Sequence, residues 1–304
     1  MFGTLLGGLP LPDASAGADA VLAAVRAQEA AGLEPITDGR LGAPGVFDPR
    51  TWDGPAGAEL AVATWRETAP LTDKAVKQAL PGPYSLGLAA GIPKRARSKA
   101  TLAFAARLHA AATALAEAGC PLIEIEETQA HRIGPDETER ELFRNAHQRL
   151  ATGFAGVHLS LSIVGGSAWE AGPATILDAP YASLAVDLVA GPDNWRLVVR
   201  TPGDRGIVAG ALATASPGDE GPEVLLWAAR YAASTGARGP ARVGLGTAGG
   251  LAGLTWDQAV AKLERLGRAV RLAGLPPGDE LATSVNPASI SARTAAVGRR
   301  TIRR

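Results

Sequence analysis

The stretch Leu71-Thr-Asp-Lys-Ala-Val-Lys-Gln-Ala-Leu-Pro-Gly-Pro83 carries a short apolar run directly before a Pro-Gly-Pro turn. A run of this kind, bounded by turn residues, predicts a buried strand over residues 75–80. The same unit, a short apolar run followed by a longer helical pattern, recurs along the chain. The other expected strands are residues 3–8, 33–37, 121–126, 157–163, 181–187, 206–211 and 241–246.

Helical patterns separate these strands, and about eight strand–helix units predict an α/β fold of the (β/α)8 TIM barrel class. The alternative is an open doubly wound sheet, which needs a Gly-rich phosphate turn after its first strand. Leu6-Gly-Gly-Leu-Pro10 lacks that spacing. We therefore expect a single barrel domain over residues 1–274 and a basic C-terminal extension or tail over residues 275–304. The expected helices are residues 18–31, a short pattern up to 67, 99–118, 135–152, 222–234 and 255–273, the last capped by Thr255.

The charge balance argues against two classes of partner. The 304 residues include 30 Lys and Arg and 30 Asp and Glu, which gives a net charge of zero, whereas nucleic-acid and membrane-surface proteins usually present a basic face. The single cysteine, Cys120, excludes an internal disulfide and a Cys-rich zinc site. We find no signal-peptide pattern and no apolar run near the ~20 residues of a spanning helix. A cytoplasmic protein without nucleic-acid or membrane partners is expected, and an oligomer or a partner protein remains open.

Polar side chains at the ends of the predicted strands are candidates for a site, because barrel enzymes place their sites at the C-terminal ends of the strands. Arg40 follows the second strand beside a glycine, and a guanidinium there can bind a carboxylate or phosphate through two hydrogen bonds. We therefore expect a small anionic substrate. The alternative is that Arg40 pairs with Glu126 or Asp187 within the protein. Further candidates for substrate binding are Asp38, Tyr84 and Arg205.

Two glutamates alternate with isoleucines on the fourth predicted strand. A period of two places Glu124 and Glu126 on one face of that strand. Buried carboxylates are costly unless they are paired or hydrogen-bonded. Glu126 is therefore a candidate catalytic acid or base, and the alternative is that it binds an arginine and only shapes the site.

One histidine lies on a predicted strand. His158, Ser160 and Ser162 share one face of the fifth strand by the same period and can line the barrel mouth. His158 is thus the second candidate for catalysis and Ser160 a candidate for substrate binding. The alternative is that His158 is a hydrogen-bonded structural residue. The histidines in helical or loop patterns are expected to be solvated: His109, His131 and His147.

Several segments together resemble the barrel of cobalamin-independent methionine synthases, in the superfamily shared with uroporphyrinogen decarboxylase. The resemblance covers nearly all of residues 3–273. It implies the (β/α)8 fold and a methyl-transfer site, although the superfamily is not specific for one reaction. The best segments are residues 18–40, 71–83, 111–127 and 157–162.

The resemblance also maps a metal site onto this chain. In the family, a His-x-Cys pair, a glutamate and a second cysteine hold zinc, and these positions match the His-Leu-Ser stretch at residues 158–160, Asp187 and residues 248–249. The resemblance therefore implies His158 and Asp187 as the remaining metal ligands. Both soft thiolate ligands of such a zinc site are replaced, so we expect zinc to be bound weakly or not at all.

The positions that bind the amino-acid substrate in the family change as well. They match Gly7-Gly8, Gly39-Arg40 and residues 126–128, so the resemblance implies that Gly8, Arg40 and Glu127 bind substrate. Where the family has a glutamate after the second strand, this chain has Arg40, which would repel a substrate ammonium group and attract an anion.

Three functions remain open from the sequence. The first is a methyl or other one-carbon transferase without thiolate-bound zinc, with Glu126 and His158 as acid, base or orienting groups and a folate or corrinoid as methyl donor. The second is a metal-free decarboxylase or lyase resembling uroporphyrinogen decarboxylase, which would use Arg40, Arg205 and Glu126. The third is a non-catalytic barrel that binds a ligand or another protein.

Overall fold

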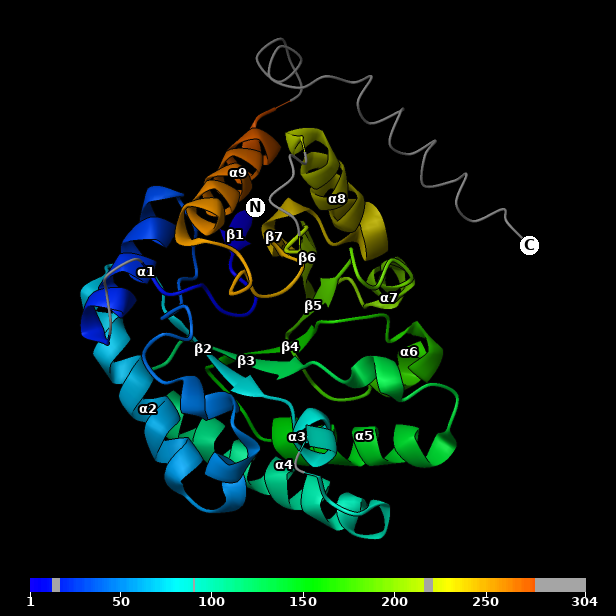
Figure 1. Cartoon of the computed structure of the whole chain (residues 1–304). Coiled ribbons are helices and arrows are strands. Elements are labelled where there is room, and N and C mark those ends of the chain that lie inside the picture. Colours follow the sequence, from blue (N-terminus) through cyan, green and yellow to red (C-terminus); the bar gives the residue numbers. More distant parts are fainter. Residues whose placement is uncertain (13–16, 90, 216–220, 277–304) are drawn as a thin grey trace.

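Seven parallel strands form one curled sheet in the spatial order β1-β7-β6-β5-β4-β3-β2 (Figure 1). The computed structural model describes residues 1–12, 17–89, 91–215 and 221–276. The two edges of the sheet are therefore β1 and β2. The strands are β1 (Phe2–Thr4), β2 (Lys77–Pro81), β3 (Leu122–Glu127), β4 (His158–Ile163), β5 (Ser183–Asp187), β6 (Gly206–Leu212) and β7 (Val243–Thr247).

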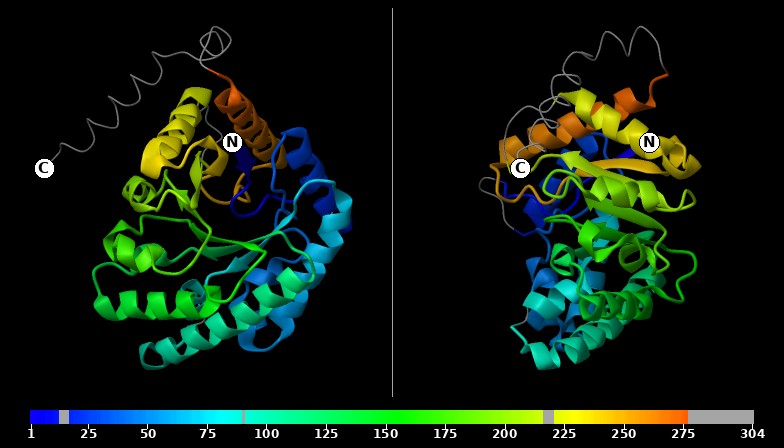
Figure 2. Two further views of the ribbon diagram at one scale, coloured as in Figure 1. Left: turned by 180° about the vertical axis from the view of Figure 1, so that it is seen from behind. Right: turned by 90° about the vertical axis from the view of Figure 1, so that its right-hand side faces the viewer.

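Helices surround the sheet on its outer side, as Figures 1 and 2 show from three directions. None of the helices in the described ranges is long and apolar enough to cross a membrane. The α-helices are α1 (Ala18–Ala30), α2 (Ala56–Thr68), α3 (Pro83–Ala89), α4 (Lys94–Glu117), α5 (Glu137–Ala151), α6 (Pro173–Leu177), α7 (Asn194–Arg200), α8 (Pro222–Ser234) and α9 (Trp256–Gly274). Short 3-10 helices are η1 (Pro44–Phe47), η2 (Pro49–Asp53), η3 (Ala69–Leu71), η4 (Ala130–Arg132), η5 (Trp169–Ala171), η6 (Thr235–Ala237) and η7 (Pro240–Arg242).

The predicted α/β class and parallel strands are confirmed, and seven of the eight predicted strands are present. The six predicted helices are present too, with ends that differ by up to five residues. The short helices α3, α6 and α7 were not predicted, because five to seven residues are too few to show a helical period. From residue 277 on, the predicted extension lies outside the described residues.

The predicted second strand, residues 33–37, is not a strand. It makes one antiparallel bridge, Gly3 with Glu34, and one parallel bridge, Ile36 with Val76. The bonds of these bridges run from Glu34 N to Gly3 O at 2.8 Å, from Ile36 N to Ala75 O at 2.8 Å, and from Lys77 N to Ile36 O at 2.9 Å. Pro35 has no N–H to donate, which interrupts any longer ladder. The segment thus spans the space between β1 and β2 without joining the sheet as a regular strand.

The two faces of the curled sheet differ in chemistry. Alternate residues of a strand point to opposite faces, and the outer face packs apolar side chains such as Ile123, Ile125 and Leu161 under the helices. The concave face carries a small apolar cluster of Leu6, Ala185 and Val208, against which Phe2 packs. Ionisable and hydroxyl side chains occupy much of the remaining concave face: Thr4, Lys77, Glu124, Glu126, His158, Ser160, Ser162, Ser183 and Asp187.

The last helix begins at the cap that the sequence predicts. Thr255 accepts a hydrogen bond from Gln258 N, and the Gln258 side chain accepts one from Thr255 N, which completes a capping box. We expect Thr255→Ala to lower the free energy of unfolding by about 1 kcal/mol, because the N–H of Gln258 in the first turn loses its acceptor. Urea unfolding followed by circular dichroism measures the change. Thr255→Ser, which keeps the hydroxyl, should retain most of the stability, and equal losses in both variants would contradict the capping role.

Candidate functional site

An arginine and a glutamate meet at the C-terminal ends of the strands. Asp38 accepts hydrogen bonds from Arg40 N at 3.0 Å and Gly42 N at 3.2 Å, which folds the chain into a tight turn. Arg40 has a φ of 62°, in the left-handed region that side chains rarely adopt. This turn directs the Arg40 guanidinium onto the carboxylate of Glu126, near the end of β3. Burial raises the pKa of Asp38, although the hydrogen bonds from the turn oppose that shift.

The surroundings fix the Arg40 side chain on two further sides. Its guanidinium carbon lies 3.7 Å from the centre of the Phe47 ring, a cation–π contact. A Cβ placed on Gly8 would lie 3.2 Å from Arg40 Cδ, so the glycine leaves room for this side chain. Of the two roles expected for Arg40, the internal pair with Glu126 is the one formed here.

Arg40 keeps some capacity for a ligand. Its side chain is 26% exposed, while that of Glu126 is 3% exposed. Arg40 Nε is buried and has no hydrogen-bond partner among the described residues. A guanidinium has five N–H donors, so an anion can reach Arg40 from the solvent side while Glu126 holds the other side. Gly8, Asp38, Arg40 and Glu126 are the predicted site residues that the structure brings together.

Glu127, which the resemblance assigned to substrate, instead points to the helices. It accepts hydrogen bonds from Tyr84 N at 2.9 Å, from Ser85 N at 2.8 Å, and from the Ser85 hydroxyl. His147 Nε2 lies 2.9 Å from its Oε1. Glu127 is completely buried and its two oxygens have four donors, so it holds the start of α3 and does not face the concave side with Glu126.

His147 is buried, and the expectation that it is solvated is wrong. His147 Nε2 is placed to donate to Glu127, and Nδ1 lies 2.7 Å from the Tyr181 hydroxyl. Burial raises the pKa of Tyr181 well above its ordinary value, and Glu127 adds to the shift, so the phenol keeps its proton. A sequence signal was present, because His147 continues the helical stripe of Phe143 and Leu150.

Tyr84 also lies among the helices and not at the expected site. Its hydroxyl donates to Glu139 Oε2 at 2.8 Å, and its ring packs edge-on against Phe143 with 5.8 Å between centroids. Burial raises the pKa of Tyr84 to about 12. Tyr84 therefore stabilises the contact between α3 and α5, while its backbone N–H contributes to the binding of Glu127.

His158 and Ser160 lie at the opposite end of the sheet from Glu126, so their expected place at the C-terminal mouth is wrong. In the register of β3 and β4, His158 pairs with Leu122, whereas Glu126 pairs with Ser162. Four residues of strand separate the two levels, which is roughly 13 Å. His158 and Glu126 therefore cannot act on the same atom of one small substrate. The bonds of His158 run to Ser183 at 2.8 Å, and Ser183 donates to Ser160 at 2.9 Å.

The residues implied as metal ligands do not come together. Asp187 ends β5, at the other end of that strand from Ser183, the partner of His158. Its carboxylate accepts from Val189 N at 2.9 Å, Ala190 N at 2.8 Å and Gly165 N at 3.2 Å. Within the described ranges, no group of three His, Cys, Asp or Glu side chains could hold a metal ion. Burial raises the pKa of the Cys120 thiol to about 12, which disfavours the thiolate form that binds zinc. These residues do not fit the family's zinc site.

Arg205 lies at the N-terminal end of β6, which it precedes by one residue, and not at the C-terminal ends. Its guanidinium donates to Leu177 O at 2.8 Å and Ala179 O at 3.1 Å, in the connection between α6 and β5. A joint anion site with Arg40 is therefore not formed. The decarboxylase hypothesis loses one of its two arginines.

The protonation of His158 gives a pH-dependent prediction. Partial burial of its ring lowers the pKa of His158, from about 6.5 in an unfolded chain, although the residue as a whole is exposed and the effect on stability is accordingly small. Folding thus favours the neutral imidazole, and its contribution to stability is present above about pH 6.5 and is lost as the pH falls toward the folded pKa. Urea unfolding across this range should show a loss of stability that His158→Asn lacks. A folded-state pKa at or above 6.5, measured from the ring proton shifts by NMR, would contradict the prediction.

Three solved structures share this fold. A B12-independent methionine synthase from Shewanella sp. W3-18-1, in complex with selenomethionine, matches with a TM-score of 0.71 and 16% identity, over 88% of this chain and 97% of that chain. A candidate vitamin-B12-independent methionine synthase from Listeria monocytogenes matches with a TM-score of 0.66 and 15% identity, over 92% and 98%. A methyltransferase from Methanosarcina mazei matches with a TM-score of 0.58 and 15% identity, over 88% and 93%.

These similarities establish the fold and not the reaction, because one fold supports many chemistries. No protein-family model and no curated protein matches the chain. The resemblance seen in the sequence is thus confirmed at the level of architecture: the chain is folded like B12-independent methionine synthases along almost its whole described length. The chemistry has to be argued from its own residues.

Proposed function

We propose that this protein is a divergent methionine-synthase-like transferase that moves a methyl or other one-carbon group to a small anionic acceptor. The proposal includes a (β/α)8 barrel in which residues 33–37 take the place of the second strand, since this segment bridges both β1 and the residue before β2. The observation that carries it is the contact of Arg40 with Glu126 at the C-terminal ends of the strands, where barrel enzymes act.

Arg40 and Glu126 would have different roles in the reaction. Arg40 would bind the acceptor's carboxylate or phosphate through the N–H groups that Glu126 does not use. Glu126, which keeps its contact with Arg40, would accept the proton of the acceptor's nucleophilic atom. That atom would form a bond to the one-carbon group while the bond between this group and a folate or corrinoid donor breaks. The residues that fail to form the zinc site have no part in these steps.

A transfer assay tests this proposal. The protein is incubated with methyl-labelled 5-methyltetrahydrofolate or methylcobalamin and a panel of small carboxylates, and labelled products are detected by mass spectrometry. We expect one donor to support transfer. Arg40→Met should raise the KM for the acceptor by about 10–100-fold, since charge-assisted hydrogen bonds contribute about 1.5–3 kcal/mol. Glu126→Gln should lower kcat.

The control is Arg50→Met, because Arg50 is largely exposed and pairs with Asp48 and not with Glu126. This variant should transfer at the unaltered rate. If neither donor class supports transfer to any member of the panel, the proposal is wrong and a barrel that only binds ligands is favoured. An Arg40→Met variant with unchanged KM would remove Arg40 from the site.

A further inference from the structure

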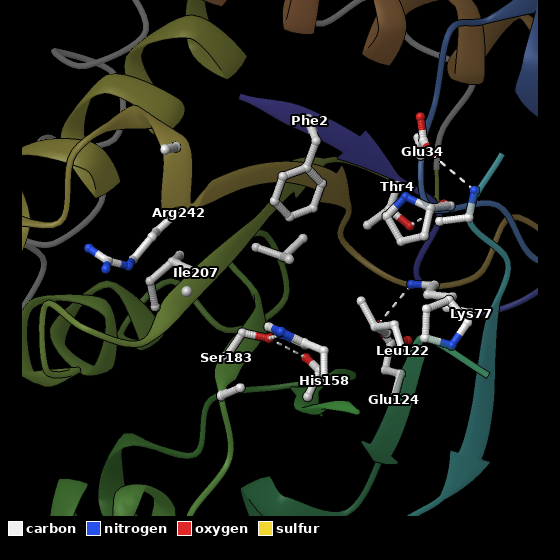
Figure 3. Close-up of a pocket in the computed structure, with 18 of the residues that line it drawn as sticks. Phe2, Thr4, Glu34, Lys77, Leu122, Glu124, His158, Ser183, Ile207 and Arg242 are labelled. Carbon is white, nitrogen blue, oxygen red and sulfur yellow. Dashed lines mark hydrogen bonds and ion pairs between the residues drawn. The ribbon is translucent and has the colours of Figure 1, made fainter. Parts of the chain in front are cut away.

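A cavity of about 540 Å³ opens at the N-terminal ends of the strands, opposite to the Arg40–Glu126 contact (Figure 3). Its walls are the first residues of several strands, such as Phe2 of β1, Lys77 of β2 and Leu122 of β3. The volume lies within the ~300–1,000 Å³ of small-molecule sites. The cavity exists because small side chains, including Ser160, Ser183 and Gly206, occupy positions on the concave face where large apolar side chains usually fill a barrel.

A buried ion pair forms one wall. Lys77 Nζ lies 2.8 Å from Glu124 Oε2, and both side chains are at most 3% exposed. Glu124 Oε1 is buried and has no hydrogen-bond partner in the described part of the chain. An unpaired buried carboxylate oxygen is costly, and Glu124 lines the cavity. A ligand that donates one hydrogen bond would remove this cost.

The rest of the wall limits the kind of ligand. Phe2, Leu122 and Val208 present apolar surface to the cavity, which suits a flat apolar body. Lys77 and Glu124 cancel in charge, and the other charged residues of the lining, Glu34, Asp204 and Arg242, add one net negative charge, so an anionic ligand is disfavoured. Lys77 has three N–H donors, of which the contact with Glu124 uses one. A group that donates to Glu124 and accepts from Lys77 at the same time, such as a carboxamide, matches this wall.

We propose that this cavity is a second binding site, for a small neutral molecule with a flat apolar body and a carboxamide-like edge. The carboxamide N–H donates to Glu124 Oε1 and the carbonyl accepts from Lys77. The apolar body lies against Phe2, Leu122 and Val208. The site is independent of the transferase proposal, because it lies at the other end of the strands and shares no residue with the Arg40–Glu126 contact.

Benzamide is the probe, and its binding to the full-length protein is measured by NMR titration. We expect saturable binding that shifts the resonances of Leu122 and Val208. N,N-dimethylbenzamide, which has no N–H, should bind about tenfold more weakly or worse, and benzoate should also bind more weakly. Benzamide that does not saturate, or that binds no better than N,N-dimethylbenzamide, overturns the proposal.

Two variants locate the site. Val208→Phe fills the cavity and should abolish benzamide binding, whereas Val199→Phe, on the exposed side of α7, should leave it unchanged. Lys77→Met with Glu124→Leu replaces the polar wall without leaving a lone buried charge and should remove the preference for benzamide over N,N-dimethylbenzamide. Full binding by the Val208→Phe variant, with its circular dichroism spectrum unchanged, would place the probe elsewhere and overturn the assignment.

Discussion

Lys77→Ala should unfold at a much lower urea concentration than the parent protein. The ammonium of Lys77 lies 2.8 Å from Glu124 on the concave face, where both side chains are almost completely buried. Removing one partner of a buried ion pair leaves an uncompensated charge, and such changes cost about 3–5 kcal/mol. For a domain with a typical total stability of about 5–15 kcal/mol, this loss is a large fraction. Urea unfolding at pH 7, followed by circular dichroism, measures it.

Two further variants test whether the loss of stability comes from the buried ion pair and not from the removal of any lysine. Lys74→Ala removes a lysine three residues earlier whose contact with Glu34, at 3.4 Å, is about half exposed, so it should change the midpoint far less. Lys77→Met combined with Glu124→Leu removes both charges and should recover most of the lost stability. If Lys77→Ala and Lys74→Ala were equally stable, the buried pair would not hold the concave face together.

Glu127→Ala should be the second strongly destabilised variant. Its carboxylate accepts hydrogen bonds from two backbone N–H groups at the start of α3, from the Ser85 hydroxyl and from His147. The alanine leaves these donors buried without an acceptor, at about 1–3 kcal/mol for each unsatisfied group. We expect a loss of stability on the order of 4 kcal/mol, because the space left by the glutamate side chain can admit water, which would accept from some of the donors.

The matched control is Glu137→Ala, since Glu137 is an exposed glutamate that pairs with Arg144 and Arg140 on the surface. Its urea midpoint should stay close to that of the parent. Where Glu127→Ala does not fold, Glu127→Gln offers a milder test, because it keeps one acceptor oxygen but turns an amide toward N–H donors. A Glu127→Gln variant as stable as the parent would show that the four donors do not depend on the carboxylate.

The strands could be predicted from the sequence because each is a short apolar run bounded by turn residues. The prediction failed at residues 33–37, which have the same composition but contain Pro35. A proline inside a predicted central strand argues against that strand, because it removes one ladder donor. Two single bridges join this segment to β1 and to the residue before β2, an arrangement that depends on both edge strands and is not encoded in the segment alone.

The sequence analysis predicted less well which end of its strand, and which face, each candidate side chain occupies. His158 is the second residue of the predicted strand 157–163, while Glu126 is the last of 121–126, so parallel alignment alone would have placed them at opposite ends. Glu127, next to Glu126, must point to the other face for the same reason. The placement of His158 at the barrel mouth and the assignment of Glu127 to the substrate, which the resemblance implied, did not take these two signals into account.

The sequence did not determine which side chains pair across the sheet. The sequence required that Glu124 be paired, but its partner Lys77 lies 47 residues earlier, on a neighbouring strand. The same holds for Arg40 and Glu126, which are 86 residues apart. A single sequence gives the period of a strand and not its register against the next strand, so internal pairing and substrate binding remained equal alternatives for Arg40.

The segment between β1 and β2 has a consequence for how the molecule opens. Residues 33–37 make only single bridges to β1 and to the residue before β2, with added side-chain hydrogen bonds from Thr4 and Gln28, whereas the other neighbouring strands share continuous ladders. Local opening of a native protein occurs where few backbone hydrogen bonds must break. Amide hydrogen exchange should therefore be faster at Glu34 and Ile36 than in β3 or β4. Glu34 and Pro35 also border the cavity at the N-terminal ends, so the same local opening would enlarge this cavity without global unfolding.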